Sequence, residues 1–72
     1  MNKEQDSLNG HIGANIRKIR CERKLSQAEL AKILEISLYP LQATEKGQTQ
    51  IMSELLEALS WALGVGYSDF FA

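Results

Sequence analysis

The sequence predicts a compact all-α domain of five helices, and three observations lead to this prediction. Isoleucines near the start of the chain recur at helical spacing, residues 26–29 have the pattern of a helix-capping box, and no apolar run alternates as a strand would. The chain has 72 residues, of which 44% are hydrophobic, so its length and composition fit one small globular domain.

The composition also excludes several classes of protein. One cysteine allows neither an internal disulfide nor a four-cysteine zinc site, and no apolar run approaches the ~20 residues of a membrane span. The first residues lack the apolar stretch of a signal peptide. No pair of nucleophile and base is evident, so an enzyme is not expected. We therefore expect a cytoplasmic protein that binds no metal, cofactor or small-molecule ligand and contacts no membrane.

The first predicted helix depends on Ile12, Ile16 and Ile19, which recur at i, i+4 and i+7 and so share one face. This helix is expected to end near residue 23. Residues 1–8 are polar and are expected to form a flexible N-terminal arm, which leaves residues 9–72 as the folded domain.

A capping box marks the start of the second predicted helix. The Ser26 hydroxyl can accept a hydrogen bond from the Glu29 N–H, while the Glu29 carboxylate accepts one from the Ser26 N–H. This helix is expected to end near Glu35.

Ser37 is a candidate N-cap for a third helix that runs to about residue 46. Pro40 would lie in its first turn, where the missing N–H costs no hydrogen bond, but it disfavours helical angles at Tyr39. One alternative is that this turn is rotated, so that Leu38 and Tyr39 pack on the domain. Two helices with so short a link form a helix-turn-helix, at about residues 26–46.

The fourth predicted helix runs from about residue 52 to residue 63, and a short fifth helix covers residues 68–71. Trp61 lies about 200° around the fourth helix from the apolar Leu59, so we expect it to point outward. An exposed tryptophan is typical of a protein interface. The alternative is that Trp61 folds over the C-terminal aromatic residues as additional core.

From Ile12 to Phe71 the sequence resembles the Cro and phage-repressor type of helix-turn-helix domain. The resemblance covers about sixty of the 72 residues without an obvious gap. Each matching piece is weak alone, but their order and spacing are specific. The pieces are Ile12-Gly13, Ile16-Arg17, Arg20, Leu25-Ser26-Gln27, Glu29-Leu30-Ala31, Ile36-Ser37, Glu45-Lys46-Gly47, Ala62-Leu63-Gly64-Val65 and Phe70-Phe71.

The resemblance implies a five-helix, lambda-repressor-like fold that binds duplex DNA as a two-fold dimer. The third helix would enter the major groove and the second would lie across the DNA backbone, with its free N–H groups near phosphate. It also implies a buried ion pair between Arg20 and Glu45. The residues expected to contact DNA are Ser26, Gln27, Ser37, Leu38, Tyr39, Gln42, Ala43, Lys46 and Gln48.

The sequence departs from the pattern of this family in several places, two of them within the helix-turn-helix. Among the groove-facing residues, only Gln42 and Tyr39 offer polar groups to base edges, so any base code is thin and favours A·T pairs. Glu35 stands where the family often has glycine, which would strain the backbone if that position needs a positive φ.

Charge is divided unevenly along the chain. The net charge is −1, unlike most DNA-binding domains, but residues 1–46 carry +2 and residues 47–72 carry −3 with no basic residue. We expect the first part to face DNA and the second to form a dimer interface, although the imbalance can also arise by chance in a short chain. The residues expected at that interface are Leu55, Trp61, Tyr67, Phe70 and Phe71.

Two functions are compatible with these features. The main expectation is a homodimeric transcription regulator whose partners are double-stranded DNA, a second copy and, for its control, a regulatory protein; its operator would be partly palindromic. The alternative is a protein-interaction module that keeps this fold with lost or weak DNA reading. The apolar start of the third helix and the net charge favour the alternative.

Overall fold

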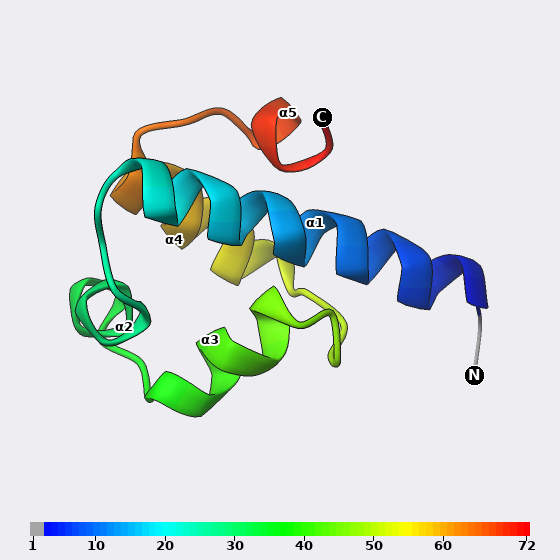
Figure 1. Cartoon of the computed structure of the whole chain (residues 1–72), viewed down its shortest axis with the longest axis horizontal. Coiled ribbons are helices and arrows are strands. Elements are labelled where there is room, and N and C mark those ends of the chain that lie inside the picture. The colour runs from blue at the N-terminus through cyan, green and yellow to red at the C-terminus, as the bar shows by residue number, and fades with distance from the viewer. Residues whose placement is uncertain (1–2) are drawn as a thin grey trace.

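The computed structural model describes residues 3–72, which form five helices and no strand (Figure 1). This confirms the all-α prediction. In Figure 1 the long α1 crosses the molecule, with α5 on one side of it and α2 and α3 on the other. The helices are α1 (Lys3–Glu22), α2 (Gln27–Leu34), α3 (Leu38–Glu45), α4 (Ser53–Leu63) and α5 (Tyr67–Phe70).

All five helices meet in one hydrophobic core. Each helix contributes at least one completely buried side chain, so all five helices take part in the core. Contacts run from α1 to α3, α4 and α5, and from α2 to α3 and α4. The five completely buried apolar side chains are Ile16, Leu30, Leu41, Leu59 and Phe70, in chain order from α1 to α5.

Helix α1 begins earlier than the isoleucine pattern predicted. Residues 3–8, which we expected to form a flexible arm, have a helical backbone continuous with the rest of α1. Residues 1 and 2 of that arm lie outside the described residues. Within residues 3–72, no helix has the length and apolar character needed to cross a membrane.

Two side chains define the ends of α2. The Ser26 hydroxyl accepts from the Glu29 N–H at 3.0 Å and the Glu29 carboxylate accepts from the Ser26 N–H at 2.9 Å, so the predicted capping box is present. At the other end Glu35 has φ 57° and ψ 41°, a left-handed conformation that reverses the chain. The Ile36 N–H then donates to the Ala31 carbonyl at 3.0 Å, which completes the turn.

Glycines allow α1 to approach the end of α3 closely. A Cβ atom at Gly13 would collide with the backbone carbonyl oxygens of Thr44 and Glu45. Gly47 has φ 69° and lies directly against the backbone of Gly10. The absence of side chains at these contacts therefore allows the end of α3 and the turn after it to pack closely against α1.

Pro40 is the third residue of α3 and does not interrupt it. Its N–H would have had no partner within the helix, and its carbonyl accepts a hydrogen bond from the Thr44 hydroxyl at 2.8 Å. Ser37 has the extended backbone of an N-cap, but its side chain makes no capping hydrogen bond. Helix α5 covers Tyr67–Phe70, one residue earlier than predicted.

Candidate nucleic-acid interface

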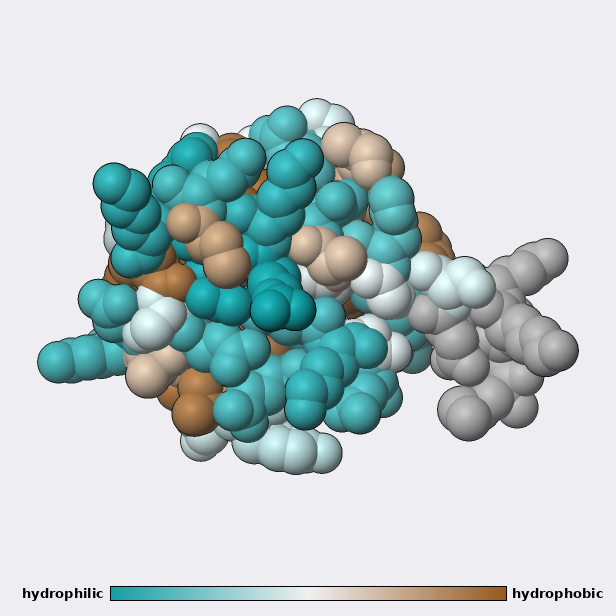
Figure 2. All heavy atoms as spheres, in the orientation of Figure 1, coloured by the Kyte–Doolittle hydropathy of each residue, from teal (hydrophilic) through white to brown (hydrophobic). Residues whose placement is uncertain are grey.

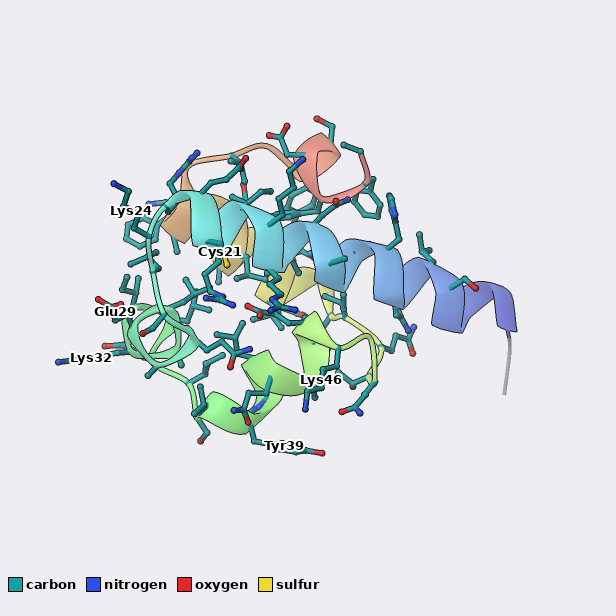
Figure 3. The ribbon with its side chains drawn as sticks, viewed as in Figure 1. Cys21, Lys24, Glu29, Lys32, Tyr39 and Lys46 are labelled. Carbon is teal, nitrogen blue, oxygen red and sulfur yellow. The ribbon has the colours of Figure 1, made fainter. Side chains whose placement is uncertain are left out.

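The outer face of α3 carries the side chains that are free to meet a partner. Tyr39 is 73% exposed and points away from the body of the molecule (Figure 3), Leu38 is exposed and Gln42 is half-buried. Leu41 and Thr44 face inward and hold the helix on the core. The alternative in which Leu38 and Tyr39 pack on the domain does not occur.

Ala43 does not belong to this exposed face. It is only 5% exposed, so its expected contact with DNA is wrong. Its small side chain lies between α3 and the start of α4, in the wall of a groove described below. Ser26, Ser37, Lys46 and Gln48 are all exposed.

Arg20 and Glu45, the residues that the resemblance assigned to an ion pair, are bound to each other in two places. Arg20 Nε donates to Glu45 Oε2 at 2.6 Å, and a terminal guanidinium nitrogen donates to Glu45 Oε1 at 3.0 Å. Another terminal nitrogen of Arg20 donates to the Leu25 carbonyl at 2.7 Å. The hydrogen bond with Glu45 raises the pKa of Arg20 above its usual value, so the charge is firmly held. The pair ties α1 to the end of α3 and to the turn before α2.

Gln27 joins this network. Its side-chain Nε2 donates to Glu45 Oε1 at 2.9 Å, which the sequence did not indicate. An amide nitrogen carries two hydrogens, so one N–H remains free. The ion pair therefore fixes Gln27 at the first position of α2 with a donor still available to an anion.

A cleft of about 430 Å³ lies beside this network, where α1, the start of α2 and the end of α3 meet. Besides the residues already named, Ser26, Arg17 and Lys46 line it, and the last two are exposed cations. Arg17 is absent from the sequence-based set of contact residues. Its position one helical turn before Arg20 could have predicted it, because the two residues lie on the same face of α1. The unpaired N–H groups at the start of α2 add positive potential here.

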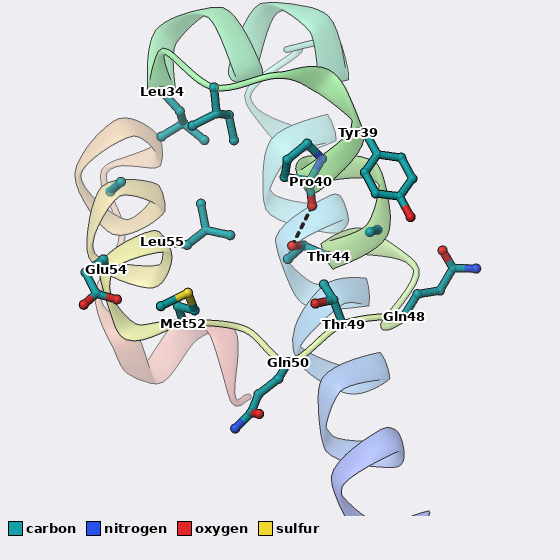
Figure 4. Close-up of a pocket in the computed structure, with 13 residues that line it drawn as sticks. Leu34, Tyr39, Pro40, Thr44, Gln48, Thr49, Gln50, Met52, Glu54 and Leu55 are labelled. Atoms are coloured by element: carbon teal, nitrogen blue, oxygen red, sulfur yellow. Dashed lines mark hydrogen bonds between the residues drawn. The ribbon is translucent and has the colours of Figure 1, made fainter. Parts of the chain in front are cut away.

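A second, larger groove of about 780 Å³ runs between α3 and the first half of α4 (Figure 4). The face of the molecule seen in Figure 2 is mostly hydrophilic, with a few hydrophobic patches. Six of the thirteen residues that line the groove are polar: Tyr39, Thr44, Gln48, Thr49, Gln50 and Glu54. Its apolar lining includes Leu34, Ile36, Pro40, Met52, Leu55 and Ala58.

The residues expected at a dimer interface differ widely in their exposure to solvent. Trp61 is 82% exposed, so the alternative in which it covers the C-terminal aromatics is wrong. Tyr67 and Phe71 are exposed, and Leu55 is half-buried in the groove. Phe70 is completely buried and belongs to the core, so its expected place at an interface is wrong.

An all-α domain whose second and third helices are joined by a left-handed turn, with polar and aromatic side chains on the outside of the third, defines a helix-turn-helix protein. Residues 16–70 match the HTH_3 family, which is described as helix-turn-helix. The chain therefore belongs to the HTH_3 family.

Three relatives illustrate the match. The chain is 34% identical over 58 residues to the antitoxin PezA of Streptococcus pneumoniae; this match covers 81% of the chain and spans only 37% of PezA. The solved structure of the clp gene regulator ClgR from Corynebacterium glutamicum has a TM-score of 0.83 and 31% identity, covering 89% of this chain and 83% of ClgR. The solved structure of the hypothetical transcription factor NHTF from Neisseria has a TM-score of 0.85 and 25% identity, and the match covers 94% of this chain and 78% of NHTF.

Proposed function

We propose that this protein is a transcription regulator that binds double-stranded DNA as a homodimer, on a partly palindromic operator. One observation carries the proposal: α3 turns Leu38 and Tyr39 outward, with Gln42 partly exposed beside them, while its opposite face is fixed in the core. Membership of the HTH_3 family and the similarity to the regulator ClgR support it. A two-fold dimer would present two such helices one DNA turn apart, about 34 Å.

In this proposal the tip of α3 reads bases in the major groove. The Gln42 amide pairs with an adenine edge, the Tyr39 phenol offers one further polar group, and Leu38 contacts a thymine methyl. The cleft beside Arg20 holds the DNA backbone. There Arg17, Lys46 and the free N–H of Gln27 face a phosphate.

The test is selection from a random duplex library at low salt, followed by sequencing of the bound DNA. A recurrent motif with two-fold symmetry is expected. Recovery of DNA without a motif would contradict sequence-specific reading. Failure of the folded protein to recover any DNA would contradict the proposal as a whole.

A substitution at Gln42 tests the reading residue separately. Gln42→Ala is expected to weaken binding to the selected operator by about 1–3 kcal/mol, because an adenine edge loses its partner, and to leave thermal stability unchanged. Lys46→Ala is the control, since loss of a phosphate contact weakens binding to all sequences alike. Unchanged operator affinity of Gln42→Ala would show that α3 is oriented differently on DNA.

The second candidate function is a protein-interaction module. The exposed Tyr39 beside a large, partly apolar groove favours it, as does the net charge of −1. Chromatography on heparin at low salt separates the two functions. A DNA-binding protein is retained, whereas an acidic interaction module elutes without delay.

A further inference from the structure

The outward face of α4 carries a large aromatic side chain flanked by two carboxylates, while the opposite face of this helix is buried in the core. At 3.6 residues per turn, Glu54 lies about 20° around the helix to one side of Trp61, and Glu57 lies about 40° to the other. All three side chains are exposed, Trp61 by 82%. Tryptophan is on average a well-buried residue, so its exposure here indicates a surface that another molecule covers.

Tyr67, the first residue of α5, extends this face on the side of Glu57. Its hydroxyl donates to the Ser53 carbonyl at 3.2 Å, and Ser53 lies one helical turn before Glu57. Desolvation, followed in size by the negative charges of Glu57 and Glu54, raises the pKa of Tyr67 above its usual value. Two aromatic rings and two carboxylates therefore share one surface, which we call the acidic–aromatic surface: Glu54, Glu57, Trp61 and Tyr67.

The carboxylates of the acidic–aromatic surface have no basic partner in the part of the chain that the structure describes. Within residues 3–72 the one ion pair joins Arg20 to Glu45, far along the sequence from α4. Residues 47–72 contain no lysine or arginine. The Glu54 carboxylate points away from Leu55 and from the middle of the groove (Figure 4). A positive charge at this surface must therefore come from another molecule.

An arginine side chain fits this surface better than a second copy of the chain does. A guanidinium group is planar, so it can stack on the face of an indole and pair with a carboxylate at the same time. Glu57 and Trp61 are one helical turn apart, the spacing at which two side chains of a helix are neighbours. A second copy would bring the carboxylates of the two α4 helices together without a base between them, which is unfavourable.

We propose that the acidic–aromatic surface binds an arginine-rich segment of a partner protein, with one guanidinium group stacked on Trp61 and paired with Glu57. The rise along α4 from Glu54 to Trp61 is about 10 Å, so three or four residues of an extended segment cover it. Further basic side chains of that segment meet Glu54. None of these residues belongs to the DNA contacts proposed above, so this inference does not depend on the proposed function.

The experiment measures binding of a hexa-arginine peptide to the full chain at low salt and without DNA. Trp61 is the one tryptophan of the chain, so its emission reports directly on contact with the peptide. We expect saturable binding that changes this emission and weakens as salt is added. Hexa-lysine is expected to bind at least about threefold more weakly, because an ammonium group does not stack on the indole. Equal affinity for the two peptides, or an unchanged emission on saturation, would overturn the proposal.

Variants test the two halves of the contact, with anisotropy of a labelled hexa-arginine peptide as the readout. Glu57→Gln keeps the shape of the side chain, removes its charge and is expected to raise the dissociation constant about fivefold. Trp61→Ala is expected to raise it by about fivefold as well, since the stacking is lost. Both residues are exposed, so the fold is retained. The charge-matched control is Glu22→Gln, an exposed carboxylate of α1 outside this surface, with an expected change of less than about twofold.

The remaining outcomes distinguish this inference from its rivals. Equal weakening by Glu57→Gln and Glu22→Gln would overturn it, since net charge alone would then be the cause. Self-association of the chain in sedimentation equilibrium that Trp61→Ala abolishes would also overturn it, because a second copy would then occupy the surface. A failure of the DNA selection contradicts the proposed function alone, since peptide binding is measured without DNA.

Discussion

Glu35 occupies a backbone conformation that suits glycine. Its φ of 57° brings the Cβ atom close to the following carbonyl, which costs a residue with a side chain about 1–2 kcal/mol. Glycine avoids this cost but gains about 0.5–1 kcal/mol of entropy in the unfolded chain. Glu35→Gly is therefore expected to raise the free energy of unfolding by up to about 1 kcal/mol, measured by urea denaturation.

The control for this prediction introduces the same residue at a helical position. Ala28 is exposed within α2, so Ala28→Gly is expected to lower the free energy of unfolding by about 1 kcal/mol. If both glycine variants lose stability, the left-handed turn at Glu35 is not strained.

Glu45 is the acceptor on which two donors converge. Removal of its carboxylate by Glu45→Ala leaves the Arg20 guanidinium largely buried and without its counter-charge, which costs about 3–5 kcal/mol. Thermal unfolding measures this loss. The double variant Arg20→Met with Glu45→Leu removes both charges and is expected to regain most of the stability. A double variant as unstable as Glu45→Ala would mean that packing, and not the unpaired charge, is responsible.

At the scale of single residues, the sequence predicted the features that depend on a residue's own position in a helix or turn. It did not predict the features that depend on contacts between helices. The resemblance to the repressor family indicated the glycine-like site at Glu35, and helical spacing predicted the outward direction of Trp61. Phe70 and Phe71 could not be distinguished, because a helix of four residues has no periodicity to show which side faces the core. The contact of Gln27 with Glu45 depends on how α2 meets α3, which no local pattern records.

At the scale of the helices, end signals predicted the elements better than apolar spacing did. The capping box set the start of α2, and glycine marked the end of α4. The start of α1 was missed because residues 3–8 present no apolar repeat, although they continue a helix that is held by its later turns. Pro40 was correctly allowed in the first turn of α3.

The capping box at α2 makes stability depend on pH. Hydrogen bonds from Ser26 lower the pKa of Glu29 below its usual value of 4.5. A lowered folded-state pKa contributes stability above the unfolded pKa, and this contribution is lost as the pH falls through the folded value. Wild-type protein is therefore expected to lose stability on acidification below 4.5 more steeply than Glu29→Gln, in urea midpoints measured across that range. Parallel profiles would mean that Glu29 contributes nothing as an ion.

At the scale of the whole molecule, charge separates the proposed DNA face from α4. All basic residues lie within residues 1–46, and the cleft with Arg17 and Lys46 draws on them. With two to four phosphates neutralised by each subunit, the logarithm of the DNA affinity should fall with the logarithm of salt concentration with a slope of about −2 to −4 per subunit.

Fluorescence anisotropy of labelled duplex DNA measures this slope. Arg17→Ala is expected to reduce its magnitude by about 1, because one phosphate contact is removed. Lys32→Ala is a matched control, since Lys32 is an exposed cation that does not line the cleft. Equal effects of the two variants would mean that the cleft is not a phosphate site.

The five completely buried apolar side chains, one from each helix, have a consequence for how the molecule unfolds. No helix can leave without exposing a completely buried side chain and the helices that pack against it, so partial opening is costly. Amide hydrogens in the middle of α1 and in α4 should therefore exchange with solvent at one common, global rate. A cut in the short segment before α5 would release Phe70 and expose the core surfaces of α1 and α4 that it covers.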